Sequence, residues 1–235
     1  MPYTCCGPLT ISETALIESQ VTYGITPRAR GWIHVCTAVA AVVASVVLVP
    51  SAWQTRSPDA GWAALVYASA VVAMFTVSAT YHRVQWTSAL AQKWMMRLDH
   101  SMIFMFIAAC YTPLAVLAME PEIGADLLTI VWTGAAAGAV LKLCWPSAPR
   151  WVGVSLYILL GYVALWYAET LLDGAGTTVV ALLLVGAALY NVGAILYGAR
   201  WPNPWPTTFG HHEFFHAFTS AAAGCHFAAI WLVVH

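Results

Sequence analysis

Charged residues are scarce in this chain of 235 residues. They make up 8% of it, whereas a soluble domain has about 25%, and hydrophobic residues make up 61%. This shortage of charge excludes an ordinary soluble fold. A helix needs about 20 apolar residues to cross about 30 Å of hydrocarbon. Seven runs reach that length, at residues 32–54, 61–82, 99–119, 124–144, 151–171, 177–198 and 209–234.

Other absences narrow the class of membrane protein. There are no ten-residue segments of alternating polarity, so an outer-membrane barrel is disfavoured. A basic start followed by an apolar run is missing from the first thirty residues, so we expect no cleaved signal peptide. The six cysteines show no disulfide spacing, since Cys5 and Cys6 are adjacent and the others lie in apolar runs. We predict an all-α integral membrane protein with an N-terminal segment (1–31) and a seven-helix bundle (32–235).

Basic residues fall almost entirely on one side of the predicted bundle. Arg56 is the exception. The other eight lie in or beside the connections of the opposite side: Arg28, Arg30, Arg83, Lys93, Arg97, Lys142, Arg150 and Arg200. Short loops rich in Lys and Arg stay in the cytoplasm. The N-terminus is therefore predicted to be cytoplasmic and, after seven spans, the C-terminus to be outside.

Two connections on the predicted cytoplasmic side are longer than turns. Residues 83–98 place tryptophan and leucine four apart among basic residues, which suits a short helix in the headgroup layer or, equally, an irregular loop. Residues 200–208, RWPNPWPTT, contain three prolines. Because proline fixes φ and lacks an N–H, we expect this segment to be stiff and extended, and to end just before the last helix.

Ionisable residues collect at the cytoplasmic end of three spans. His82 closes the second span, Asp99 opens the third, and His212 and His216 open the seventh. Residues four apart share a helix face, so His212 lies beside His216, and Ser78 beside His82. Three imidazoles from two helices can converge on one metal ion. Three protein ligands leave an open fourth position, which is typical of catalytic zinc, although three imidazoles also suit iron, nickel or copper.

The H-E-x-x-H pattern at 212–216 is also that of zinc metalloproteases. A protease site in the membrane needs a further ligand, and Leu172-Asp173-Gly174 offers one. The topology rejects it, because Asp173 ends the fifth span at the outer side, about 30 Å away. Glu213 is then expected to face the headgroups as an acid favoured by the helix dipole. The alternative is that it polarises a water on the metal.

The remaining histidines are expected to be outside the metal site. His226 returns to the face of His212 but lies about 21 Å deeper, so we expect a buried, hydrogen-bonded side chain. His34, His100 and His211 flank the inner site and are expected to be interfacial or to support the ligands.

With these residues identified, the chain resembles the hemolysin III branch of the progestin and adiponectin receptor family. The matching blocks are PRARGWIH at 27–34, SATYHR at 78–83, LDHSMIFMFIAACYTPL at 98–114 and HEFFHAFTSAAAGCHFAAI at 212–230. The family pattern is Ser-x-x-x-His ending the second helix, an Asp early in the third and His-x-x-x-His in the seventh. Three separated motifs in the same order make the resemblance specific.

The resemblance implies a zinc ion bound by His82, His212 and His216 near the cytoplasmic face. It also implies that Asp99 holds a zinc-bound water and that Ser78 donates a hydrogen bond nearby. The related receptors and alkaline ceramidases hydrolyse lipid amides. The implied function is therefore zinc-dependent hydrolysis of a lipid amide or ester, in which Asp99 accepts the proton of the water and Ser78 steadies the oxyanion.

Two other functions fit parts of the pattern. One is a membrane sensor or homeostasis protein in which zinc only joins helices. The other, suggested by the family name, is a cytolytic hemolysin, although seven apolar spans leave no obvious secreted form. The resemblance also implies the inner (cell) membrane of a bacterium, with membrane lipids as partners and no nucleic acid.

Overall fold

The computed structural model describes residues 27–145 and 148–235. Within them the chain is helical, apart from turns and one isolated bridge between Trp205 and Phe209. Seven helical segments are long and apolar enough to cross a membrane, so the predicted all-α membrane bundle is confirmed. Most of the predicted N-terminal segment 1–31, including Cys5 and Cys6, lies outside the described residues.

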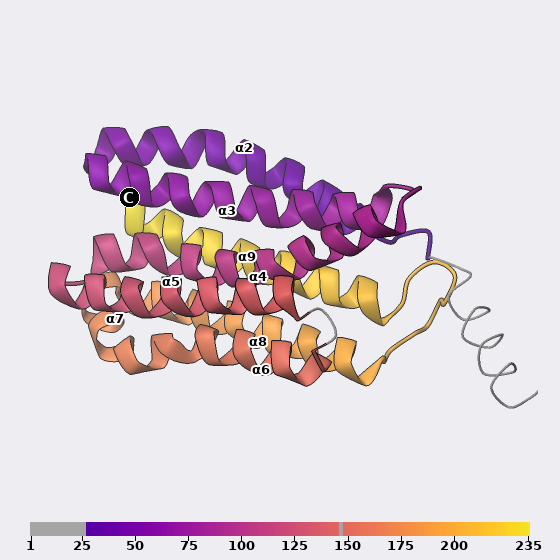
Figure 1. Cartoon of the computed structure of the whole chain (residues 1–235). Helices are drawn as coiled ribbons and strands as arrows, with labels where there is room; N and C mark the ends of the chain where they lie inside the picture. The colour runs from indigo at the N-terminus through magenta and orange to yellow at the C-terminus, as the bar shows by residue number, and fades with distance from the viewer. Residues whose placement is uncertain (1–26, 146–147) are drawn as a thin grey trace, which may run out of the picture.

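The spanning segments follow one another with short connections. They are α2 (Trp32–Thr55), α3 (Pro58–Arg83), α4 (Ala89–Ala118), α5 (Pro121–Cys144), a composite of α6 (Arg150–Gly161), η1 (Tyr162–Tyr167) and α7 (Ala168–Ala175), then α8 (Thr177–Ala199) and α9 (His211–Val234). Successive segments run in opposite directions, so α3 ends and α9 begins at the same end of the bundle (Figure 1). We call this the histidine end. The C-terminus lies at the opposite end.

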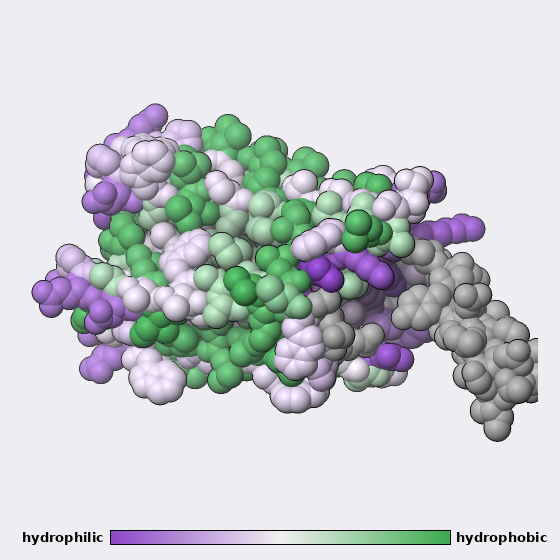
Figure 2. All heavy atoms as spheres, in the orientation of Figure 1, coloured by the Kyte–Doolittle hydropathy of each residue, from purple (hydrophilic) through white to green (hydrophobic). Residues whose placement is uncertain are grey.

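The outer surface of the bundle is apolar where lipid would contact it. Figure 2 shows hydrophobic residues over the middle of the molecule and hydrophilic ones gathered towards its two ends. Val43 and Val46 of α2 are 63% and 68% exposed. Such an exterior is expected when hydrocarbon rather than water surrounds the helices.

The third spanning helix is longer than predicted. It begins at Ala89, so Asp99 is not at its start but more than two turns inside it. The Ser88 side chain accepts a hydrogen bond from the Ala91 amide and caps the helix. No proline or glycine interrupts residues 89–98, so a separate headgroup helix or loop was the wrong expectation for most of this connection.

The fifth span is broken by the 3-10 segment η1, which the sequence pattern did not reveal. The Tyr111 hydroxyl of α4 donates to the Gly161 carbonyl at 2.6 Å and accepts from the Ala164 amide at 3.0 Å. A neighbouring helix therefore supplies bonds to backbone groups at the break, which is how non-helical backbone is tolerated at membrane depth.

The proline-rich connection to α9 is non-helical, as predicted, but it folds back rather than remaining extended. The Phe209 amide donates to the Trp205 carbonyl at 2.8 Å and the Trp205 amide to the Phe209 carbonyl at 3.3 Å. Backbone amides of Arg28 and Ala29 donate to the carbonyls of Thr207 and Thr208, both at 3.1 Å. The turn thus joins the start of α2 to the start of α9.

Candidate metal centre

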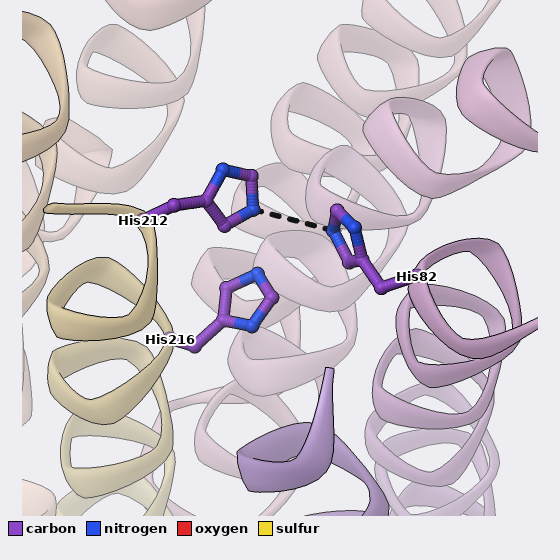
Figure 3. A group of neighbouring side chains, drawn as sticks. All are labelled: His82, His212 and His216. Carbon is purple, nitrogen blue, oxygen red and sulfur yellow. Dashed lines mark hydrogen bonds between the residues drawn. The ribbon is translucent and has the colours of Figure 1, made fainter. Parts of the chain in front are cut away.

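Three histidine rings converge at the histidine end of the bundle. His82 comes from the last turn of α3, and His212 and His216 from the first two turns of α9. Figure 3 shows the two α9 rings facing the ring of His82. One ligand nitrogen from each histidine lies within 4.8 Å of the others. Within the described part of the chain, no carboxylate belongs to this group.

The spacing of the nitrogens fits a metal site. The Nε2 atoms of His82 and His212 are 3.3 Å apart. Zinc binds histidine nitrogen at about 2.0–2.1 Å, and two ligands of a tetrahedral ion are then about 3.3 Å apart. Two neutral imidazoles can also share a hydrogen bond at this distance. His216 is 2% exposed, and its Nδ1 is buried without a hydrogen-bond partner among the described residues.

Ser78 lies beside the histidines, and Asp99 of α4 interacts with Ser78. Ser78 is one turn before His82 on α3, and its hydroxyl is 2.9 Å from Nδ1 of His34. The same hydroxyl is close enough to interact electrostatically with the Asp99 carboxyl group of α4. Since a serine hydroxyl carries one hydrogen, donation to Asp99 requires it to accept from His34. Helices α2, α3 and α4 therefore each contribute one of these three interacting side chains.

His34 is closer to the centre than an interfacial residue would be. It is 3% exposed, and its ring is stacked on that of His216, with centroids 3.7 Å apart and planes at 13°. The ring edge also meets Phe75 at 5.0 Å. These contacts agree with a supporting position and contradict an interfacial one. The sequence offered no signal for the stacking beyond the position of His34 near the start of its span.

Glu213 does not face the headgroups as expected. Its side chain is 1% exposed and forms an ion pair with Nε of Arg30. It also accepts a hydrogen bond of 2.8 Å from the Gly210 amide, which satisfies an otherwise free donor at the start of α9. The expectation was wrong because Arg30, 183 residues earlier, brings a charge that compensates the buried Glu213 carboxylate. Sequence reasoning missed this role of Arg30.

Gly31 allows the start of α2 to approach the centre closely. It has φ of +80°, a conformation that glycine adopts readily. A Cβ atom there would lie 2.8 Å from Cβ of His82. The Arg83 side chain also donates to the Arg30 carbonyl at 3.5 Å. Arg30 and Gly31 thus hold α2 against the histidine-bearing ends of α3 and α9.

Other predicted residues lie away from the three histidines. Asp173 is in α7 at the opposite end of the bundle (Figure 1), in agreement with the rejection of a protease site. The ring of His226 packs on Gly186 of α8, whose hypothetical Cβ would be 2.4 Å away. It has an electrostatic contact with the Leu183 carbonyl. Neither ring nitrogen makes a hydrogen bond of normal geometry to a described residue, so beyond this contact with Leu183 the expected hydrogen bonding of His226 stays a prediction.

Together the fold and the site define a class: a seven-helix membrane protein with a three-histidine candidate metal centre near one end. The profile of the family described as Haemolysin-III related matches residues 23–227. The chain belongs to that family.

Curated relatives agree with this assignment. The chain is 24% identical over 221 residues to Hemolysin-3 of Bacillus cereus, covering 94% of each chain. It is 30% identical over 136 residues to the Hemolysin-3 homolog of Bacillus subtilis (strain 168), covering 57% of this chain and 60% of the relative. It is 24% identical over 209 residues to human Monocyte to macrophage differentiation factor, covering 86% and 82%. The predicted family resemblance is confirmed.

Proposed function

We propose that this protein is a zinc-dependent hydrolase of a lipid amide or ester in the inner (cell) membrane of a bacterium, with its histidine end in the cytoplasm. The observation that carries the proposal is the convergence of His82, His212 and His216 from two helices. The positive-inside rule supports the orientation, because eight of nine Lys and Arg residues fall on the side of the histidine end.

We assign the metal to the three imidazoles. When bound, zinc supplies a Lewis acid that polarises a carbonyl group and makes water a stronger nucleophile at neutral pH. His82 joins α3 to α9 through this site, and His34 limits rotation of the His216 ring by stacking on it. The absence of a carboxylate from the described ligand group favours an open fourth position. It disfavours a closed site of four protein ligands, which would be purely structural.

Asp99 is the proposed proton acceptor. It is partly buried and lies on α4, where it interacts with Ser78 of α3. Ser78 lies 2.9 Å from Nδ1 of His34 and interacts with Asp99, so its hydroxyl can help to orient the Asp99 side chain. We therefore propose that Ser78 positions the Asp99 carboxylate, and the oxyanion contact expected from the sequence stays a prediction.

A groove between α2, α3 and α9 supports a substrate that arrives from the bilayer. Its volume is about 420 Å³, and Phe75, Ser220 and Phe227 are among the residues that line it. Phe75 also contacts His34, which stacks on His216. Hydrocarbon chains fit apolar walls of this kind, and the groove runs along spanning helices.

The test is hydrolysis of lipid amides and esters in mixed micelles by the zinc-loaded protein. The wild type should release fatty acid, and the variant carrying both His82→Ala and His212→Ala should release none and bind no zinc. Undiminished hydrolysis by the double variant would overturn the assignment of the site. If the zinc-loaded wild type hydrolyses no amide or ester, the hydrolase assignment is wrong. The function as a membrane sensor then remains.

A further inference from the structure

Below the candidate metal centre, α9 carries a polar stripe towards the middle of the bundle. His212, His216, Thr219 and His226 follow one another at spacings of three, four or seven, so they share one face. Ten residues separate His216 from His226, which is about 15 Å along the helix. The stripe is therefore too long to serve the metal centre alone.

Polar side chains from other helices meet this stripe at its deep end. Tyr67 of α3 and Cys110 of α4 belong to one buried cluster, against which Tyr190 of α8 packs. The ring of Tyr190 is 5.5 Å from that of His226 and meets it edge-on. Four helices thus bring two phenols, a thiol and an imidazole to one region of the membrane interior.

These groups lack protein partners of normal geometry. The hydroxyls of Tyr67, Tyr190 and Thr219 and both ring nitrogens of His226 are buried without a hydrogen bond to any described residue. Tyr67 is 0% exposed. Tyr111 differs, because its hydroxyl is bonded to backbone groups around Gly161. Buried polar groups without partners are costly in hydrocarbon, and so many in one region indicate a ligand that carries hydrogen bonds.

We propose that Tyr67, Tyr190 and His226 form an internal site that binds water in the middle of the bundle. Water is the chemical class that fits, since the site offers both donors and acceptors and no net charge, and a buried water makes about three hydrogen bonds. The unpartnered Thr219 hydroxyl continues the same stripe towards His216. Tyr67 also lines the groove proposed for the substrate, but none of the three side chains belongs to the metal centre, so the water site is tested without reference to hydrolysis.

Hydroxyl-radical footprinting of the purified full-length protein tests the proposal. Radiolysis of bound water oxidises the side chains that touch it, even when bulk solvent does not reach them. Tyr67 and Tyr190 should be oxidised several-fold faster than Tyr111, the buried tyrosine with protein partners. Equal rates for the three tyrosines would overturn the proposal.

Removal of the hydroxyl groups gives a second test. Tyr67→Phe and Tyr190→Phe keep the ring and remove only the group that would bond to water. Each should lower the midpoint of thermal unfolding by about 2–4 °C. Tyr111→Phe should have a similar effect, because it loses the hydrogen bond to the Gly161 carbonyl. An unchanged or raised midpoint for Tyr67→Phe and Tyr190→Phe would contradict the water site, because loss of a dry, unpaired hydroxyl relieves a cost.

Discussion

The two polar regions along α9 differ in how their groups are satisfied. At the histidine end, Glu213 is paired with Arg30 and Ser78 contacts His34 and Asp99. At the deep end, Tyr190 and His226 pack on each other without such bonds among the described residues. Unpaired atoms occur in both regions, since Nε2 of His34 and Nδ1 of His216 also lack a partner among the described residues. Over residues 27–145 and 148–235, only the histidine end has an ion pair that holds its side chains in place, whereas the deep end is where we propose bound water.

The largest expected effect is at Asp99. Asp99→Asn should lower the rate of lipid hydrolysis by about 10²–10⁴-fold, because a positioned proton acceptor contributes that much. Zinc content should not change, since the three histidines remain. The measurement is initial rate with metal analysis of the same sample.

Asp126→Asn is the matched control for that variant. Asp126 is exposed near the start of α5, at the opposite end of the bundle. If Asp99→Asn hydrolyses lipid as fast as this control, Asp99 takes no part in the reaction. The proposed distinction between the two polar regions would then fail.

The next effect concerns the ion pair that organises the histidine end. Glu213→Gln should lower the free energy of unfolding by about 1.5–3 kcal/mol, since a charged hydrogen bond is lost and Arg30 stays half-buried. Glu122→Gln is the control, because Glu122 is also a first-turn acid but is exposed. Equal denaturant midpoints for the two variants would mean that the pair does not stabilise this end.

A smaller effect is expected at the deep end. Gly186→Ala should cost about 1–3 kcal/mol, because the added methyl group would lie 2.4 Å from the His226 ring and the packed core must shift. Gly224→Ala meets no atom within 4 Å and serves as the control. Thermal unfolding in detergent compares the two. If Gly186→Ala unfolds at the same temperature as Gly224→Ala, the His226 ring is free to move away from the added methyl group.

The smallest effect is at the cap of α4. Ser88→Ala should cost about 1 kcal/mol or less, because the residue is exposed and only one capping bond is lost. Hydrogen exchange should speed up over the first turn of α4 and not at Asp99. Faster exchange reaching Asp99 would mean that the cap also holds the proposed proton acceptor.

Sequence alone was sufficient for the number of spans and for the meeting of the three histidines. Apolar length fixes how many helices cross the bilayer, and the spacing of His212 and His216 fixes their shared face. Alternating spans then bring them to the same end as His82. Metal binding itself stays a prediction.

Contacts between distant segments could not be predicted in the same way. The pairing of Glu213 with Arg30 joins residues 183 apart, and no local pattern encodes it. The break in the fifth span depends on the Tyr111 hydroxyl of another helix. The early start of α4 was missed because apolar length was used as the boundary, although a capped amphipathic turn can extend a helix beyond hydrocarbon.

The most direct measurement is the metal content of the purified protein by elemental analysis, with His82→Ala and His226→Ala prepared in parallel. We predict one zinc ion per chain in the wild type, its loss in His82→Ala and its retention in His226→Ala. Zinc retained in full by His82→Ala would contradict the claim that α3 and α9 share a metal ion.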